Sequence, residues 1–237
     1  METSAASPHP ALDAPARRAA LLLVYAAIAL TLIEYVFNPA FFRARFPDFA
    51  TEHNGLYPHL WWAFGTIVLY LPIPMLIIRF GFKQSLRDYG WTLRIAPAHW
   101  WLYAGILVVM APIVVIAANQ ASFLAVYPFF RGAADASFGA VVAWELAYLS
   151  QFLALEFFFR GVLAIGLGQS MGRLAVWVAV VPYCMIHYHK PLPEALAAIV
   201  AGLILGELAQ RTRSIAGGVL AHGCVAFTMD MLALARR

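Results

Sequence analysis

Four side chains that can hold a charge or move a proton lie inside apolar stretches of the second half of the sequence: Glu156, Arg160, His187 and His222. The first two belong to the segment LALEFFFRGVLAIGL, residues 153–167. An ionised side chain costs about 2.5–3.5 kcal/mol at the centre of a membrane helix on insertion scales, so such residues are candidates for a functional site. At a spacing of four, Glu156 and Arg160 share one helix face, where they can also simply neutralise one another.

Two histidines lie on the apolar runs that follow. His187 is four residues beyond Tyr183, so the two rings share a helix face, and His222 lies within the last run. Glu156 and both histidines can therefore meet from three helices, with Glu156 as the base that activates water. The same three residues are also a possible ligand set for a divalent metal such as zinc, although HExxH is absent. Taken alone, His187 is best explained as a hydrogen-bonded core histidine.

Two further acids, Glu145 and Asp230, lie in or beside the apolar runs. Glu145 precedes Glu156 by eleven residues, close to three helical turns, so both carboxylates fall on one face. A structural or interfacial role explains Glu145 more simply than catalysis does. Asp230 lies two turns beyond His222, where it can serve as an accessory polar group.

Other features near the C-terminus are explained by the surface or by packing. Glu207 and Arg211, four residues apart near a helix end, are expected to form a surface pair. His189 lies just before KPLP, where its span ends, and is expected at the membrane interface. The small residues that recur every four positions, and so allow close helix contact, are Ala198, Gly202 and Gly206.

Composition identifies the class of protein. Of 237 residues, 63% are hydrophobic and 12% charged, with a mean hydropathy of +0.76. Soluble domains are about 45–50% apolar and about 25% charged, so this is an integral membrane protein. The net charge of +4 comes from arginines beside apolar runs, which indicates membrane topology and predicts no nucleic-acid partner. Cys184 and Cys224 lack metal-ligand spacing and are expected to be small core residues.

The apolar runs predict an all-α, multi-pass transmembrane helix bundle of about seven spans, within a range of six to eight. A span needs about 20 apolar residues. Two runs are longer than one span needs, so a break or tilt is expected, and Pro72, Pro74 and Pro112 are expected to kink their helices. The predicted helices are 19–37, 59–80, 99–127, 138–168, 171–188, 192–209 and 214–234.

Three regions differ in character along the chain. Residues 1–16 are rich in Pro, Ala and Ser and are predicted to be a disordered tail. Residues 17–135 hold three transmembrane helices with their loops, and residues 136–237 hold the core with the polar site. The first apolar run reaches Phe37 without a convincing cleavage site, so we interpret it as an uncleaved span.

The Lys and Arg residues of the loops predict a cytoplasmic N-terminus, and the Ala/Arg-rich composition suits a bacterial inner membrane. The strongest cytoplasmic loop, residues 79–94, is expected to lie on lipid headgroups. The nine basic residues expected inside are Arg17, Arg18, Arg79, Lys83, Arg87, Arg94, Arg173, Arg211 and Arg213. The six expected outside are Arg43, Arg45, Arg131, Lys190, Arg236 and Arg237.

Three segments, taken in order, resemble the motifs of one protein family. LEFFFRG, residues 155–161, resembles the EExxxR motif, often ending in FRG, of the CPBP family, which includes the CAAX prenyl endopeptidases and the bacterial Abi proteins. YCMIH, residues 183–187, is similar to its FxxxH motif. RTRSIAGGVLAHGCVA, residues 211–226, is similar to its third segment, a turn before a helix bearing HxxxN. The resemblance covers about residues 138–234.

The resemblance implies a multi-helix membrane bundle that cleaves peptide bonds near the membrane. Family members are called glutamic proteases, because a Glu is taken to activate water, or metalloproteases in older naming. Carried over, Glu156 matches the second Glu of the first motif and Arg160 its Arg. His187 and His222 match the histidines of the second and third motifs. The implied partners are membrane lipid and a membrane-associated protein or peptide substrate, and the implied cofactor is either none or a divalent metal.

Two positions depart from the family pattern. Leu155 replaces the first Glu, which is taken as the base in relatives, and Ala226 replaces the Asn that is thought to steady the oxyanion. Glu145 and Asp230 are candidate substitutes. The departures leave two functions open: an active intramembrane peptidase, or a catalytically inactive membrane scaffold with the same fold. A proton-coupled transporter is a weaker third hypothesis, because no pair of interrupted helices recurs in matching halves.

Overall fold

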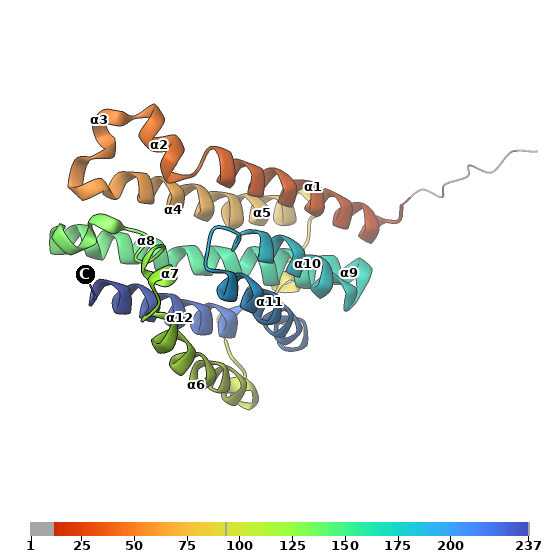
Figure 1. Ribbon diagram of the computed structural model, residues 1–237. Helices are drawn as coiled ribbons and strands as arrows, with labels where there is room; N and C mark the ends of the chain where they lie inside the picture. Colours follow the sequence, from red (N-terminus) through yellow and green to blue (C-terminus); the bar gives the residue numbers. More distant parts are fainter. Residues whose placement is uncertain (1–11, 93, 237) are drawn as a thin grey trace, which may run out of the picture.

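The computed structural model describes residues 12–92 and 94–236, and these residues form helices and turns without a β-strand (Figure 1). The α-helices are α1 (Ala14–Tyr35), α2 (Pro39–Arg45), α3 (Pro47–Ala50), α4 (Leu56–Tyr70), α5 (Pro72–Leu76), α6 (Trp100–Ala117), α7 (Ala121–Leu124), α8 (Phe138–Glu156), α9 (Leu167–Met171), α10 (Leu174–Met185), α11 (Leu192–Thr212) and α12 (Ala216–Leu234). The 3₁₀ turns are η1 (Glu52–Gly55), η3 (Leu86–Tyr89), η4 (Pro97–His99) and η5 (Arg131–Asp135), and the π-helical segments are η2 (Ile77–Gly81) and η6 (Phe157–Gly166).

In the described part of the chain, six helical segments are long and apolar enough to cross a membrane, which confirms the predicted multi-pass bundle. They pack in layers: α1 lies beside α4 and α5, α8 with its continuation passes through the middle, α12 follows, and α6 is outermost (Figure 1). The six segments are Ala14–Tyr35, Glu52–Gly81, Pro97–Ala117, Phe138–Met171, Leu192–Thr212 and Ala216–Leu234.

The fifth predicted span is shorter than expected. The run 171–188 forms α10, a helix of 12 residues. At about 1.5 Å per residue, such a helix reaches only part of the way through a hydrocarbon layer of about 30 Å. Helix α10 forms a hairpin with α11, and the described part of the chain has six long spans and this one shorter apolar helix.

Two other boundaries differ from the sequence prediction. Helix α1 begins at Ala14, inside the predicted tail, because Asp13 accepts a hydrogen bond from the Ala16 N–H at 2.8 Å and caps the helix. Residues 1–11 of that tail lie outside the described residues. The predicted run 99–127 ends as a helix at Ala117 and breaks before α7, which is the break that its length indicated.

The prolines act differently in the two helices that carry them. Helix α4 ends at Tyr70, and Leu71 leaves helical geometry with φ −121° and ψ −76° before Pro72 begins α5. This break confirms the predicted kink, because the ring of a proline clashes with the preceding turn. Pro112 lies inside α6, which continues to Ala117 without interruption.

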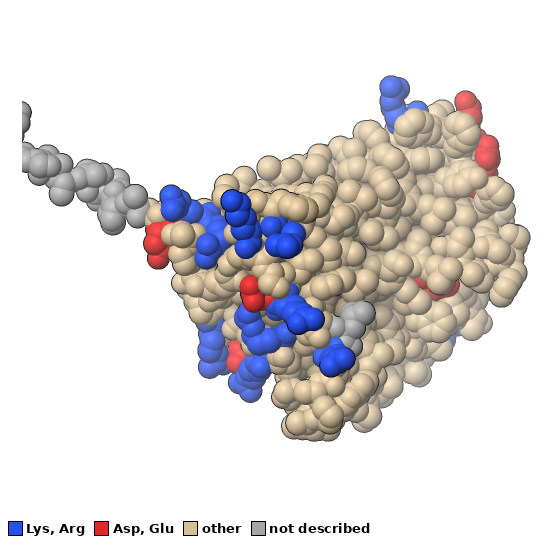
Figure 2. Space-filling model, turned by 180° about the vertical axis from the view of Figure 1, so that it is seen from behind, with Lys and Arg blue, Asp and Glu red and all other residues tan. Residues whose placement is uncertain are grey.

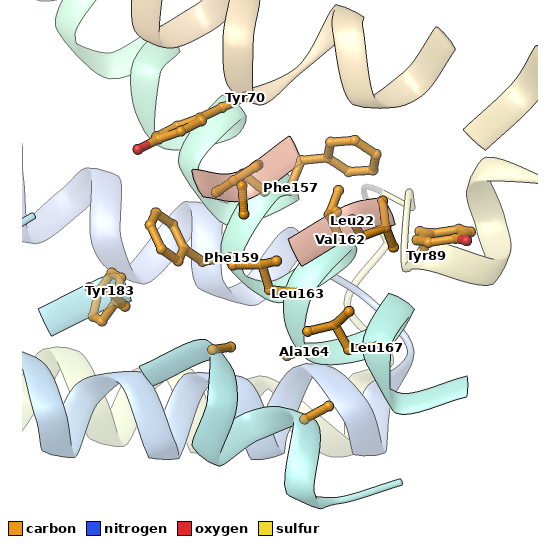
Figure 3. Close-up of a cluster of buried hydrophobic side chains, with 14 of the residues drawn as sticks. Leu22, Tyr70, Tyr89, Phe157, Phe159, Val162, Leu163, Ala164, Leu167 and Tyr183 are labelled. Atoms are coloured by element: carbon orange, nitrogen blue, oxygen red, sulfur yellow. The ribbon is translucent and has the colours of Figure 1, made fainter. Parts of the chain in front are cut away.

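The centre of the bundle is the aromatic segment that follows Glu156. Phe157, Phe158 and Phe159 are almost fully buried, in a cluster that also holds side chains of α1, α4 and α10 (Figure 3). Tyr70 stacks on Phe158 with ring centroids 4.3 Å apart, and Tyr183 meets Phe159 edge-on at 5.2 Å. Lipid tails are as apolar as these side chains, so close packing rather than water exclusion holds the helices together.

Charged residues gather at one end of the molecule. Figure 2 shows most of the visible Lys and Arg around the end where α1 begins, a few charged residues at the opposite end, and almost no charge on the visible side between them. We call this the basic end; it is formed by the start of α1, the segment 79–94, the α9–α10 junction and the end of α11, which together carry the nine basic residues predicted to share one side. The uncharged sides are the surface expected to face lipid.

The segment 79–94 is more than an interfacial loop, because Tyr89 inserts into the core with 1% of its surface exposed. A Cβ added to Gly161 would lie 2.7 Å from the Tyr89 carbonyl oxygen, and one added to Gly166 would lie 2.6 Å from the Tyr89 ring. The glycine that ends the FFFRG segment is therefore required by the close approach of this loop.

The predicted stripe of small residues on α11 is confirmed as the contact with α10. A Cβ on Gly202 would lie 2.6 Å from Val180 and 2.9 Å from Tyr183, and a Cβ on Gly206 would lie 2.8 Å from Val176. These glycines let the hairpin close tightly and so fix the position of Tyr183.

We expect Gly202→Ala to lower the midpoint of thermal unfolding in detergent micelles, because the added methyl group has no room against Val180 and Tyr183. The matched control is Gly105→Ala in α6, where nothing lies within 4 Å of the new Cβ. There alanine should be neutral or stabilising by about 1 kcal/mol, its helix-propensity advantage over glycine. Equal midpoints for the two variants would contradict this account of the hairpin.

Candidate active site

The buried carboxylate of Glu156, the last residue of α8, is the centre of the site. Glu156 is completely buried, and its two oxygens face two different cations or donors. Oε2 lies 3.4 Å from Arg160 Nε, and Oε1 lies 3.0 Å from His222 Nδ1. The pairing of Glu156 with Arg160 and the meeting of Glu156 with His222 both agree with the sequence prediction.

The hydrogen bond between Glu156 and His222 defines how the imidazole is used. An ionised carboxylate can only accept hydrogen bonds, so Nδ1 of His222 carries the hydrogen. In the neutral ring Nε2 is then a free acceptor. The His222 side chain keeps 16% of its surface exposed, whereas Glu156 keeps none. Of the two groups, His222 is the one that retains exposed surface.

A glycine of α12 allows the helix to approach Glu156. A Cβ on Gly218 would overlap the Glu156 carboxylate, so this position must lack a side chain for the carboxylate to lie against the helix. Phe152, one turn before Glu156 on α8, packs on the His222 ring at 4.7 Å between centroids. Gly218 belongs to the segment RTRSIAGGVLAHGCVA, and the sequence alone did not indicate this role for it.

Arg160, Tyr183 and His187 form the second half of the site. The Arg160 guanidinium lies 4.1 Å above the centroid of the Tyr183 ring, and this ring meets His187 edge-on at 4.9 Å. The Nδ1–H of His187 donates to the Tyr183 carbonyl oxygen at 2.8 Å, which leaves Nε2 as an acceptor. His187 is thus held by a hydrogen bond to α10. The Tyr183 ring contacts both His187 and Arg160, and so links His187 to the Glu156 pair.

The residues predicted as possible metal ligands, Glu156, His187 and His222, all belong to this site. Within residues 12–92 and 94–236, no group of three or more His, Cys, Asp or Glu side chains is arranged to hold a metal ion. Glu156, His187 and His222 are therefore neighbours in one site but are not assembled as a ligand set in this structure.

Glu145 and Asp230 lie in a second polar cluster, apart from Glu156. The indole N–H of Trp144 donates to Asp230 Oδ2 at 3.2 Å, and Asp230 and Glu145 are close enough to interact. His59 of α4 adds its ring 5.5 Å from that of Trp144. Eleven residues of α8 separate Glu145 from Glu156, which corresponds to about 16 Å along a helix. The structure therefore places both candidate substitutes away from the Glu156 site.

The two departures from the family motifs are filled by apolar packing. Leu155 is half-buried against the main core, and Ala226 is buried beside Phe152 and Trp144. At these two positions packing replaces polar chemistry.

The surface assignments from the sequence are confirmed. Glu207 pairs with Arg211 at 2.8 Å and with Arg173 at 2.9 Å, and His189 meets Glu34 at 3.3 Å on an exposed face. These pairs lie outside the site and serve as controls for it.

Six spanning segments around a buried Glu–Arg–His cluster define an integral, multi-pass membrane protein with a polar site inside its helices. Residues 137–228 match the family model of type II CAAX prenyl endopeptidase, Rce1-like. The match contains all four candidate catalytic residues and confirms the family resemblance for this part of the chain. It supports a CAAX-protease-like intramembrane peptidase in general. Comparisons with curated proteins and with solved structures give no match.

We expect Arg160→Met to destabilise the protein strongly, because it leaves Glu156 buried beside one histidine as its remaining partner. Breaking a buried ion pair costs about 3–5 kcal/mol, whereas an exposed pair contributes about 0–1 kcal/mol. Arg211→Met breaks the exposed pair with the same four-residue spacing and should change the unfolding midpoint little. The double variant Glu156→Gln with Arg160→Met should recover much of the loss. An Arg160→Met midpoint equal to that of wild type would contradict the pairing.

Proposed function

We propose that this protein hydrolyses a peptide bond close to the membrane surface, with the Glu156–His222 pair as the group that activates water. The observation that carries this proposal is the fully buried carboxylate hydrogen-bonded to a histidine that is still partly exposed. A histidine whose Nδ1–H is held by a carboxylate is a stronger base at Nε2, because the carboxylate stabilises the imidazolium form. The family match to residues 137–228 supports the same reaction class.

In the proposed reaction, His222 Nε2 takes a proton from water while the water oxygen attacks the scissile carbonyl carbon. The carbonyl π electrons move to its oxygen and form a tetrahedral oxyanion. Collapse of this intermediate breaks the carbon–nitrogen bond, and the proton held by His222 passes to the leaving nitrogen. Glu156 keeps its proton-free form throughout and compensates the positive charge on His222. This refines the role inferred from the sequence, where Glu156 itself was the base.

Arg160 and His187 have supporting roles. Arg160 is a positioning residue, because its guanidinium lies beside the Glu156 carboxylate and over the Tyr183 ring. His187 presents Nε2 as an acceptor, so in its neutral form it orients the attacking water, and in its protonated form it stabilises the oxyanion. This division of roles provides a physical reason why Leu155 can be tolerated: the base of the reaction is His222.

The depth of the site indicates which side the substrate comes from. Gly218, which faces Glu156, lies two residues after the start of α12, and the preceding Ile215 N–H donates to the Gly90 carbonyl at 3.1 Å in the loop of the basic end. The site therefore lies near the basic end of the bundle. By the positive-inside rule we propose that this end and the N-terminus face the cytoplasm of a bacterial inner membrane. The partners would be lipid and a membrane-associated peptide.

A catalytically inactive scaffold is the second candidate. It is favoured by Leu155 and Ala226, whose places are filled by apolar contacts and offer no polar group to a substrate. In that case the buried charges would serve to orient helices, and a partner protein would bind to the bundle without being cut.

We expect Glu156→Gln and His222→Ala to lower the rate of cleavage by about 10²–10⁴-fold, the usual contribution of general acid–base catalysis. The measurement compares membranes from cells that express each variant at matched protein levels, by mass spectrometry of the termini of membrane proteins. One set of new termini should be present with wild type and absent with both variants.

The matched control for this experiment is Glu207→Gln, which changes the same residue type in an exposed pair with Arg211 and should leave every terminus unchanged. Identical termini in wild type, Glu156→Gln and His222→Ala would refute the peptidase and favour the scaffold.

A further inference from the structure

A cavity of about 300 Å³ opens at the basic end between the start of α6, the preceding loop and the start of α12. Its wall combines the loop residues Arg94 and His99 with Thr212 and Gly217 beside α12. Tyr103 of α6 lies at its inner boundary and is 2% exposed. None of these α6 and loop residues belongs to the segment matched by the family model, which begins at residue 137.

Two adjacent glycines of α12, Gly217 and Gly218, lie next to the cavity and next to the Glu156 carboxylate, respectively. Gly217 is covered by the Tyr103 ring, and a Cβ there would overlap the ring. The next residue, Gly218, is covered by the Glu156 carboxylate in the same way. Neighbouring residues of a helix point about 100° apart, so Tyr103 and Glu156 flank the same short piece of backbone.

From this arrangement we infer that the Tyr103 ring separates the cavity from the Glu156 side of the site, and that a substrate entering from the cavity must displace the ring to lie against the Glu156–His222 pair. Tyr103 lines the cavity, and its ring and the Glu156 carboxylate lie against adjacent glycines of α12. Glu156 itself has no exposed surface. Tyr103 is thus a gating residue from outside the family segment.

The packing of α6 is suited to such displacement. Helix α6 lies wholly within the described residues, and its buried side chains are those of Tyr103 and Val114. The helix packs mainly on α12 and exposes a broad apolar surface that includes Trp101, Val108 and Ile116. Because lipid can replace neighbouring side chains on that surface, moving the start of α6 costs mainly the contact between Tyr103 and Gly217.

The inference rests on the proposed function only in taking the Glu156–His222 pair as the site that the substrate must reach, and Glu156 is the buried member of that pair whose exposure reports the opening. Access to Glu156 can be measured without any cleavage. The purified full-length protein in lipid nanodiscs is treated with a water-soluble carbodiimide and an amine, and the modified carboxyl groups are located by mass spectrometry. Wild type and Tyr103→Phe, which keeps the ring, should show little modification of Glu156.

Tyr103→Ala removes the ring and should raise the modification of Glu156 severalfold. Gly217→Ala places a methyl group where the Tyr103 ring lies, so it should push the ring aside and also raise the modification of Glu156. This second variant tests the inference if Tyr103→Ala does not fold. Glu145, buried in the second polar cluster, is the internal reference and should stay unmodified. Modification of Glu156 at the wild-type level in these variants, or a rise that Glu145 shares, would overturn the inference. Failure of the peptidase proposal would leave this result unchanged.

Discussion

The need to keep one carboxylate ionised inside an apolar bundle governs the structure of this protein. Glu156 has no contact with solvent, so Arg160 and His222 must provide the interactions that water would otherwise give. Arg160 comes from the same helix, but His222 has to be brought from α12 with a glycine at Gly218 to make room. The close contact between α8 and α12 at this level is part of that requirement.

Polar groups occur at two levels along the antiparallel helices α8 and α12. The level near the basic end holds Glu156 and His222, and the other holds Glu145 and Asp230 with Trp144. Between them the helices are joined by apolar side chains. A charge at one level therefore affects the other only weakly, since about 16 Å of packed helix separates them. The second cluster helps to orient the two helices but does not take part in the proposed reaction.

The sequence was sufficient for what depends on one helix at a time. Apolar runs gave the spans, and the four-residue spacing of Glu156 and Arg160 gave their pairing. Contacts between helices depend on depth and rotation, which packing decides. For this reason the contact between Tyr103 and Gly217 was not foreseen. The sequence put Glu145 on the same helix face as Glu156 and favoured a structural role for it, but a shared face does not identify the neighbours, which here are Trp144 and Asp230.

The replacement of two polar family positions by Leu155 and Ala226 is consistent with this arrangement of charges. Adjacent residues of a helix point about 100° apart, so a carboxylate at 155 would face a different direction from Glu156 and would require its own compensation in the bundle. Leu155 avoids that cost by packing on the apolar core. If the Glu156–His222 pair carries the reaction, the loss of the neighbouring carboxylate removes a charge without removing the base, because proton transfer requires one accessible acceptor and His222 provides it.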